Sequence, residues 1–415
     1  MKLPNRPIVC IDMRSFYASC AAVEAGLDVM KTPIAIIGNK ERKGGVVLAA
    51  SPPLKKQFGI RTGNRLFEIP KDPSIQLIEP KMEYYLKVSM EITRLLNVYV
   101  PKEKIFPYSI DESFIDLSGT ERLWGSPLQV IERIRDDLLR QFQLHAAFGM
   151  GPNLLMAKLA LDLEAKKTGI AVWSYEDIEE KLWPVTPLKK VWGIGGRLQK
   201  RLNDLGIFSV RDLAHADLHM LERKFGVMGH QLYNHAHGID LTKMNPFVFD
   251  DQISFGKGQI FYRDYVKQAD ISVVLLEMCE DIAMRLRSSK QQACTVHLSV
   301  SYSKHMGGGG FSRAHTLQEA TNDTMALFDV CVLLLDTFHD GQPIRQLMIR
   351  VSKLEDEKVV QLSLFDQHKW KKRVLNETID ELRRTYGTTT ILRAASYTEA
   401  GTAIERSSLI GGHYK

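Results

Sequence analysis

Two adjacent acidic residues, Asp111 and Glu112, stand inside the otherwise apolar stretch SIDESFIDLSG, residues 109–119. Successive side chains of a regular strand point to opposite faces of the sheet, so adjacent acids within one strand cannot share a site. At the corner of a hairpin, both side chains can lie at the same end of the sheet. Taken alone, the pair is more typical of a solvated hairpin turn, so its chemistry depends on the residues around it.

Asp12 is the third acidic residue that the pattern can bring to this place. It ends the apolar stretch RPIVCID, which predicts the first strand of the chain. If this strand lies beside the hairpin, three carboxylates converge and raise one another's pKa values, so the cluster requires a cation. Oxygen ligands without His or Cys suit a hard ion, above all Mg²⁺. Two such ions, roughly 3.5–4 Å apart, clamp the attacking and leaving oxygens in phosphoryl transfer.

The segments around these acids alternate between strand and helix patterns. Apolar runs typical of strands are PIAIIG, GGVVLAAS, KIFPYSI, SFIDLSG and AAFGMG. Helical patterns are SFYASCAAVEA with Ser15 as the expected N-cap, residues 82–98, IERIRDDLLRQF, and NLLMAKLALDLEAKK opened by Asn153. This alternation predicts an α/β or α+β layer structure for the first part of the chain.

The pattern changes near Pro184. Residues 186–245 predict short helices broken by glycine, with 9 basic residues against 5 acidic ones. After NPFVFDDQ, a predicted linker, strand and helix patterns follow in the order β-α-β-β-α-β. From about Glu355 onward the periodicity is weaker.

The composition is that of an ordinary globular protein, with 44% hydrophobic and 25% charged residues. A length of 415 residues predicts roughly two to four domains. No apolar run is long enough to cross a bilayer and the chain starts without a signal-peptide core, so we expect a cytoplasmic protein without a membrane partner. The five scattered cysteines argue against a zinc site or a disulfide framework. A net charge of +6 permits a polyanionic partner.

Four motifs occur in the order and spacing of the Y-family DNA polymerases, the translesion enzymes, and the chain resembles this family over residues 7–353. They are IDMRSFYAS, SIDESFIDLSG, FGMGPNLLMAKLA and VWGIGGRLQKRLNDLGI. The later segments QLSLFD, GTTTILRAAS and ERSSLIGGH are similar to UmuC-type members of Gram-positive bacteria, often called UV-damage repair proteins.

The resemblance implies an α+β multidomain fold, the right-hand polymerase arrangement. Its parts are an α/β palm, small fingers, a helical thumb with a helix–hairpin–helix, and a β-α-β-β-α-β little finger. The implied boundaries are palm 1–24 and 80–176, fingers 25–79, thumb 177–245, linker 246–254, little finger 255–353, and a C-terminal tail 354–415.

The resemblance also assigns roles at the acidic cluster. Asp12 and Asp111 match the family's two metal-binding aspartates, and Glu112 matches the adjacent catalytic glutamate. Met13 matches the position whose backbone carbonyl completes the second metal site. The implied ligands are therefore Asp12, Met13, Asp111 and Glu112, and the implied cofactor is a pair of Mg²⁺ ions, for which Mn²⁺ can substitute.

Phe16 and Tyr17 match an aromatic pair of the family, in which the second ring is the steric gate against a ribose 2′-OH. A rigidly held ring can reject one extra oxygen, because overlap in a packed site is costly. Without Asp12 five residues earlier, Tyr17 is more typical of a core aromatic at a strand–helix junction.

The triphosphate of an incoming nucleotide needs cationic partners. In SPPLKKQFGIRTG, Lys56 matches the family's basic position, while its neighbour Lys55 is more typical of solvated surface. Lys166 in DLEAKKTG matches the second triphosphate lysine. Pro53 stands where many relatives have a tyrosine, and Ser51 is the candidate to replace that contact.

A helix–hairpin–helix is the expected DNA contact in VWGIGGRLQKRLNDLGI. Gly193 and Gly195 allow a tight turn, and the amide groups that follow can hold a phosphate, with Arg197 and Lys200 adding charge. The alternative is a tight helical corner without a ligand. In the little finger, Lys257 and Arg263 are further candidates for phosphate contacts.

Residues 361–366, QLSLFD, have the spacing of bacterial sliding-clamp-binding peptides. Gln361 would enter a polar pocket of the clamp, while Leu364 and Phe365 would fill an apolar one. Exposed hydrophobic anchors in a polar segment require a partner. The alternative is that these residues dock on the protein's own surface.

The resulting hypothesis is an error-prone translesion DNA polymerase that acts on primer–template DNA and dNTPs and binds a sliding clamp. UmuC-type relatives also work with a UmuD-like accessory protein and a RecA filament in the SOS response. Two alternatives remain: a catalytically idle scaffold that binds DNA and the clamp, and a nucleotide cyclase that shares the two-metal sheet. The intact acids argue against the first, and the helix–hairpin–helix argues against the second.

Overall fold

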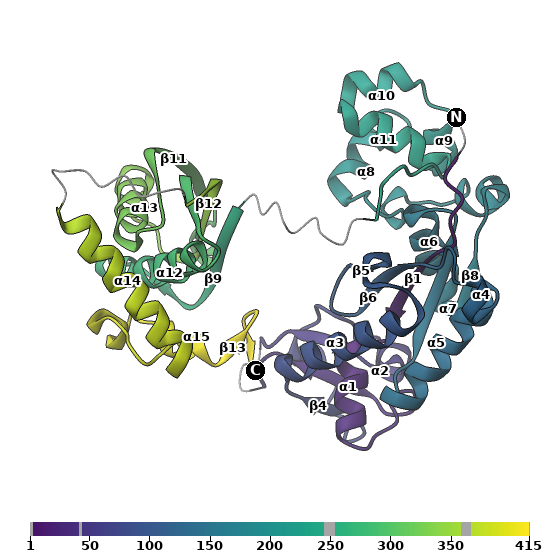
Figure 1. Cartoon of the computed structure of the whole chain (residues 1–415), viewed down its shortest axis with the longest axis horizontal. Helices are drawn as coiled ribbons and strands as arrows, with labels where there is room; N and C mark the ends of the chain where they lie inside the picture. Colours follow the sequence, from purple (N-terminus) through teal and green to yellow (C-terminus); the bar gives the residue numbers. More distant parts are fainter. Residues whose placement is uncertain (1–2, 41–43, 245–253, 358–366, 415) are drawn as a thin grey trace. The chain divides into compact units, whose positions relative to one another are not determined.

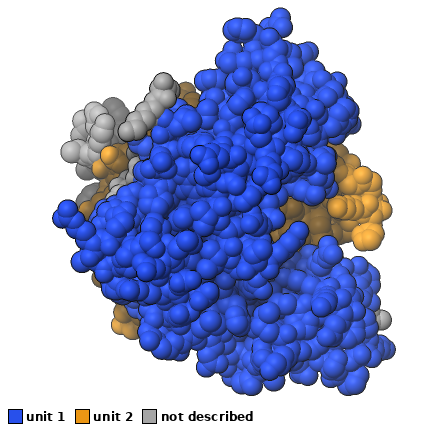
Figure 2. Space-filling model, turned by 90° about the vertical axis from the view of Figure 1, so that its right-hand side faces the viewer, with its two compact units in different colours: residues 1–247, 413–415 blue, residues 248–412 orange. Residues whose placement is uncertain are grey.

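The computed structural model describes residues 3–40, 44–244, 254–357 and 367–414 (Figure 1). The chain forms two compact units, Met1–Phe247 with His413–Lys415, and Val248–Gly412, which Figure 2 shows in blue and orange. The predicted linker, residues 246–254, lies outside the described residues except at its last position. Among the described residues we find no helix with the length and hydrophobicity that crossing a bilayer requires.

A five-stranded sheet in the order β5-β6-β1-β7-β8 forms the centre of the first unit. Its central strand pairs antiparallel with both neighbours, and only β7 and β8 run parallel. Four predicted strands of this sheet are confirmed with these bounds: β1 (Ile8–Met13), β5 (Ile105–Pro107), β6 (Glu112–Asp116) and β7 (Ala146–Gly151). The short strand β8 (Ile170–Val172) was not predicted. Strand β1 is almost wholly buried, as its apolar sequence IVCIDM requires.

Helices pack around this sheet (Figure 1). The helix predicted over residues 82–98 is confirmed as α3 (Met82–Tyr99). The other helices here are α1 (Phe16–Glu24), α4 (Glu121–Trp124), α5 (Pro127–Phe142), α6 (Leu154–Ala160) and α7 (Lys166–Thr168). Asn153 caps α6 as predicted, because its side chain accepts a hydrogen bond from the Met156 amide at 2.9 Å. A π-helical turn, Leu161–Ala165, joins α6 to α7.

Ser15 stands at the N-cap position of α1, as predicted, but its side chain makes no capping hydrogen bond. Its backbone is left-handed with φ 47°, and its hydroxyl accepts a hydrogen bond from Lys55 at 3.0 Å instead. The capping prediction is therefore right about the position and wrong about the hydrogen bond.

A second, smaller sheet in the order β3-β2-β4 lies between α1 and α3 in the sequence. Its strands are β2 (Ile34–Ile37), β3 (Val47–Ala50) and β4 (Gln76–Ile78). The helix α2 (Pro52–Phe58) lies between β3 and β4 in the sequence. These elements share a small core of Ala, Ile, Leu and Val side chains. The region corresponds to the segment predicted as fingers.

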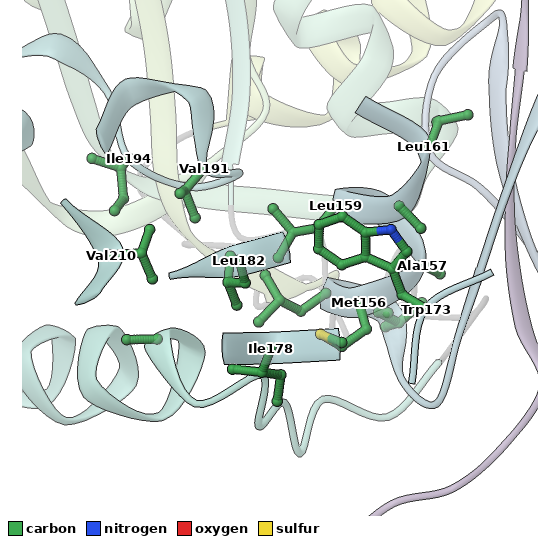
Figure 3. Close-up of a cluster of buried hydrophobic side chains, with 14 of the residues drawn as sticks. Met156, Ala157, Leu159, Leu161, Trp173, Ile178, Leu182, Val191, Ile194 and Val210 are labelled. Atoms are coloured by element: carbon green, nitrogen blue, oxygen red, sulfur yellow. The ribbon is translucent and has the colours of Figure 1, made fainter. Parts of the chain in front are cut away.

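Four short helices follow the large sheet: α8 (Gly196–Asn203), α9 (Val210–Ala214), α10 (Leu218–Phe225) and α11 (Val227–Ala236). They do not form a core of their own. Met156 and Leu159 of α6 belong to the same hydrophobic cluster as Val191, Ile194 and Val210 (Figure 3). Because this core is continuous, the helical region is anchored to the sheet that carries the acids.

The second unit contains an antiparallel four-stranded sheet in the order β11-β10-β12-β9. The predicted β-α-β-β-α-β order is confirmed as β9 (Ser254–Tyr265), α12 (Gln268–Ser288), β10 (Gln291–Tyr302), β11 (Gly310–Thr321), α13 (Thr324–Phe338) and β12 (Ile344–Asp356). Both helices lie against one face of the sheet and share a core with its strands (Figure 1).

The segment after Glu355, where the sequence periodicity weakens, is folded over residues 367–412. It contains α14 (Gln367–Tyr386), α15 (Ala403–Ser407) and the short strand β13 (Leu409–Ile410). Polar contacts hold it to α12: Arg287 pairs with Asp380 at 2.6 Å, and Arg406 pairs with Glu277 at 3.3 Å. An element held by ion pairs has no strong apolar stripe, which explains the weak periodicity.

Candidate active site

The three acidic residues meet at one end of the five-stranded sheet. Asp111 ends the loop between β5 and β6, and Glu112 is the first residue of β6. Asp12 on β1 is the direct antiparallel partner of Glu112. Directly opposite residues project to the same face of a sheet, so Asp12 and Glu112 share one face. The hairpin corner places Asp111 beside them, and the Met13 amide donates a hydrogen bond to its carbonyl at 2.9 Å.

A cavity of about 550 Å³ opens at this end of the sheet. Its acidic wall is made by Asp12 and Asp111, and the backbone from Met13 to Tyr17 lines it as well. Further lining residues are the cations Arg14, Lys55 and Lys166 and the small or apolar side chains Leu48, Ala49 and Ala50 of β3. One cavity therefore combines carboxylates, cations and aromatic rings.

The pKa of Asp12 is shifted by its surroundings. Burial raises its pKa above the ordinary value, Asp111 and Glu112 raise it further, and Lys166 opposes the shift. The Lys166 ammonium lies 2.9 Å from the Asp12 carboxylate. A further positive charge beside Asp12 would favour its ionised form, because opposite charges lower the pKa of a carboxyl group.

Glu112 lies behind the cavity wall and does not line the cavity. Its carboxylate pairs with the Lys158 ammonium at 2.8 Å, and both side chains are buried. The Cys10 thiol donates a weak hydrogen bond to the same carboxylate at 3.1 Å. Burial, followed by the charge of Glu112, raises the pKa of this thiol well above its ordinary value, so Cys10 stays protonated as a donor.

The donor set fits Mg²⁺. Within the described ranges, no three His, Cys, Asp or Glu side chains are gathered to hold a metal ion by themselves. Mg²⁺ does not need such a cage, because it keeps several waters and binds one or two carboxylates together with substrate phosphates. Asp12 and Asp111 supply two carboxylates in a cavity large enough for such a substrate.

Tyr17 lies on the cavity wall and is supported from behind. Its ring stacks on that of Tyr85 from α3, with ring centroids 4.7 Å apart and an interplanar angle of 14°. Tyr85 is fully buried, and burial raises its pKa to about 12. Phe16 is also buried and contacts both rings. The sequence interpretation included Phe16 and Tyr17 and missed Tyr85, which lies 68 positions further along the chain.

The structure reverses the roles expected for the two lysines of α2. Lys55 lines the cavity and donates to the Ser15 hydroxyl at 3.0 Å, whereas Lys56 is exposed and does not line it. Burial lowers the pKa of Lys55 below its ordinary value. Ser51 does not line the cavity, and its buried hydroxyl accepts from the Ile34 amide and donates to the Thr32 carbonyl, both at 2.8 Å, which argues against a nucleotide contact.

Lys166 lies on the cavity wall, where the motif comparison expected it. Its ammonium bridges Asp12 and Asp162, the latter at 2.8 Å, and these partners raise its pKa against the opposing effect of burial. Arg14, a residue that the sequence interpretation did not use, donates to the Lys166 carbonyl at 3.2 Å. Three cationic side chains, Arg14, Lys55 and Lys166, thus line the same cavity as the aromatic rings.

The glycine-rich turn before α8 has the geometry of a helical hairpin. Gly193 has a positive φ of 88°, which favours glycine. Gly195 is the N-cap of α8 with an ordinary φ of −82°, so its conformation does not demand glycine. Gly193, Gly195, Arg197 and Lys200 are all exposed, and a phosphate can approach them.

Lys257 and Arg263 of β9 differ in their exposure. Lys257 is half-buried and pairs with Asp281 of α12 at 3.0 Å, so a phosphate would compete with that carboxylate. Arg263 is exposed, and its guanidinium donates to the Glu399 carbonyl at 2.9 Å. Phosphate contact stays a prediction for both. The clamp-type residues Gln361, Leu364 and Phe365 lie outside the described residues.

The chain matches three models of one protein family. They are the impB/mucB/samB family over residues 11–162, the IMS family HHH motif over residues 175–207, and the impB/mucB/samB family C-terminal domain over residues 252–364. A solved Y-family DNA polymerase chimera aligns with a TM-score of 0.67 and 19% identity, covering 84% of this chain and 99% of the chimera. The fold is therefore the right-hand fold of the Y-family polymerases, as the motifs predicted.

Two curated relatives extend along the whole chain. UvrX of Bacillus subtilis (strain 168), named for UV-damage repair, is 48% identical over 414 residues, which cover 99% of this chain and 98% of UvrX. DNA polymerase IV 2 of the same organism is 37% identical over 417 residues, with 100% of both chains covered. The chain belongs to the impB/mucB/samB family, the Y family of translesion DNA polymerases.

Proposed function

We propose that this protein is an error-prone translesion DNA polymerase, which adds dNTPs to a primer 3′-OH opposite damaged template DNA by two-metal phosphoryl transfer. The observation that carries the proposal is the shared cavity of Asp12, Asp111, Tyr17, Lys55 and Lys166. Carboxylates for metal ions, cations for a triphosphate and a ring for the sugar are the groups that nucleotidyl transfer needs.

In this proposal, Asp12, Asp111 and the Met13 carbonyl hold two Mg²⁺ ions. When bound, the ions would lower the pKa of the 3′-OH and stabilise the charge of the departing pyrophosphate. Lys55 and Lys166 orient the triphosphate as point charges. Glu112 was expected to be a metal ligand as well as the catalytic glutamate. Because its carboxylate pairs with Lys158 and does not line the cavity, we assign it only to the chemical step, in which it contributes negative charge from behind the metal-binding aspartates.

Tyr17 acts as the steric gate, with Phe16 beside it and Tyr85 behind it. The small side chains of Ala49 and Ala50, which also line the cavity, leave the nascent base pair loosely covered. Loose covering favours tolerance of damaged templates and low fidelity, because discrimination requires a tight pocket.

The domain boundaries follow the same proposal: palm 1–24 and 80–176, fingers 25–79, thumb 177–245 and little finger 255–353. The thumb holds duplex DNA through the amides and cations around Gly193, Gly195, Arg197 and Lys200. Such phosphate contacts position a duplex without reading its sequence. For the second unit, we assign DNA contact to the open face of the sheet, where Arg350 and Tyr262 are exposed.

The proposed partners are primer–template DNA, dNTPs and a sliding clamp that binds residues 361–366. A UmuD-like accessory protein and a RecA filament are further candidates, by analogy with UmuC-type relatives. A catalytically idle scaffold of the same fold is the alternative that an activity measurement excludes.

The test is extension of a primed template by the purified protein with Mg²⁺ and dNTPs, beside the Asp111→Ala variant. We expect the wild type to extend primers on undamaged and abasic templates, and the variant to lose about 10³-fold or more in rate, as for loss of a group that acts on transition-state charge. Equal DNA affinity of both proteins is the control for folding. Failure of the wild type, even with the sliding clamp added, would favour the scaffold.

A further inference from the structure

Two side chains connect the Glu112 carboxylate to Lys166 and have no role in the mechanism above. Lys158 of α6 is buried with 6% of its surface exposed, although lysine is rarely buried. Asp162 lies one helical turn further along the chain, in the π-helical turn. Neither residue lines the cavity.

The five charged groups form one chain of alternating sign. The Lys158 ammonium lies 2.8 Å from the Glu112 carboxylate and 3.1 Å from that of Asp162. Lys166 lies 2.8 Å from Asp162 and 2.9 Å from Asp12. The order Glu112–Lys158–Asp162–Lys166–Asp12 therefore links the acid behind the cavity to the lysine on its wall.

The spacing of the sequence supports this arrangement. Lys158, Asp162 and Lys166 follow at intervals of four residues, which places neighbouring members on one face of a helix. The π-helical turn Leu161–Ala165 lies between the two lysines. Turns of this kind are rare in proteins as a whole. Those that occur often lie at functional sites, where they redirect the side chains that follow.

Each link has a physical consequence. Lys158 gives the buried Glu112 a charged partner and holds its carboxylate in one position. Asp162 lies between two ammonium groups that would otherwise repel each other. When Asp12 engages a cation other than Lys166, Asp162 still holds Lys166 at the cavity wall.

We propose that Lys158 and Asp162 are positioning residues for nucleotidyl transfer: Lys158 fixes Glu112, and Asp162 holds Lys166 for the triphosphate. This inference rests on the proposed polymerase function. It assigns the two residues different effects, because Glu112 belongs to the chemical step and Lys166 belongs to nucleotide binding.

Single-turnover insertion of one dNTP on a primed template separates the two effects. For Lys158→Met we expect the maximal rate to fall roughly 10–100-fold, as for other residues that orient a catalytic group, with a nearly unchanged dNTP dissociation constant. For Asp162→Asn, which keeps the side-chain shape, we expect the dNTP dissociation constant to rise about 10-fold, with the maximal rate changed less than about threefold.

Three controls separate positioning from folding. Active-site titration gives the concentration of active protein, so that the measured rates are not lowered by misfolded molecules. Lys167→Met is the matched control variant, because it changes an exposed lysine next to Lys166. Binding of a non-hydrolysable dNTP analogue to the protein–DNA complex checks Asp162→Asn without catalysis. In the Glu112→Gln background, Lys158→Met should lower the maximal rate of insertion little further, because the effects of residues that act through one another are not additive.

Wild-type protein that does not extend primers overturns the proposed function itself. Active wild type with unchanged rate and binding constants in both variants overturns the positioning roles alone. Additive losses in Lys158→Met and Glu112→Gln show that Lys158 does not act through Glu112, and this also contradicts the inference.

Discussion

The two lysines of α2 differ at the scale of single residues, although they are neighbours in the sequence. Lys55 lies on the cavity wall, and Lys56 points to solvent. A helix turns about 100° per residue, so adjacent side chains face different directions. Which of them can contact a nucleotide therefore depends on how α2 is rotated against the sheet.

We predict that Lys55→Ala raises the KM for dNTPs by about 10-fold. This factor is the loss of binding affinity expected when one hydrogen bond to a charged group is removed. Lys56→Ala is the matched control and should stay close to wild type. Steady-state insertion kinetics on one template measure both variants. Equal effects of the two substitutions would contradict the placement of Lys55.

A second prediction at this scale concerns the ring behind the steric gate. Tyr85→Leu removes the surface on which Tyr17 stacks, so the gate loses rigidity. We expect ribonucleotide insertion relative to deoxyribonucleotide insertion to rise roughly fivefold, since one aromatic pair is worth about 1 kcal/mol. Tyr84→Leu is the control, because the ring of Tyr84 contacts Tyr85, whereas Tyr17 stacks on Tyr85 itself. An unchanged ratio in Tyr85→Leu would show that Tyr17 is held by other contacts.

At the scale of elements, the C-terminal segment is part of the second unit. Glu277 of α12 accepts a hydrogen bond from the Thr402 amide and pairs with Arg406. Glu280 of the same helix pairs with Arg383. Arg287 near the end of α12 pairs with Asp380 of α14, and both side chains are buried. The family match ends at residue 364, so this segment is an addition to the matched domain.

We predict that Asp380→Asn destabilises the second unit by roughly 3 kcal/mol, because removal of one partner leaves the other charge buried without compensation. Urea unfolding should show a lower midpoint for this variant. Glu381→Gln changes the exposed neighbouring acid and should leave the midpoint close to wild type. If both variants unfold at the same midpoint as wild type, the segment does not stabilise the unit.

At the scale of the whole molecule, the two units carry different parts of the proposed function. The first holds the candidate active site and the helical hairpin, and the second holds a sheet with one open face. The clamp-type residues 361–366 stand between β12 and α14 in the sequence, both of which belong to the second unit. The proposed clamp binding can therefore be tested separately from the chemistry by mutation of these residues.

We predict that the double variant Leu364→Ala, Phe365→Ala loses most of the stimulation by a sliding clamp, roughly 10-fold or more for two hydrophobic anchors. Extension without the clamp should be unchanged, and this measurement is the internal control. A loss of thermal stability without a loss of clamp stimulation would show instead that these residues dock on the protein itself.

Sequence patterns alone predicted most of the elements around the acidic corner. Period-2 and period-3.6 patterns located strands such as β1 and β7 and helices such as α3 and α5, because such patterns record which side of each element is buried. The short strands β4 and β8 and the helix α14 were missed. The spacing of Asp12 from the hairpin at Asp111 and Glu112 was enough to expect their convergence, since β1 had to pair with a neighbouring strand.

Tertiary structure decided which side chains can work together. The choice of Lys55 over Lys56, the burial of Ser51 and the support of Tyr17 by Tyr85 depend on contacts between segments far apart in the sequence. The ion pair of Lys257 with α12 is a further case of the same kind. Local patterns contain no information on these contacts, because the rotation of a helix and the covering of a sheet face are set by the packing of the whole unit.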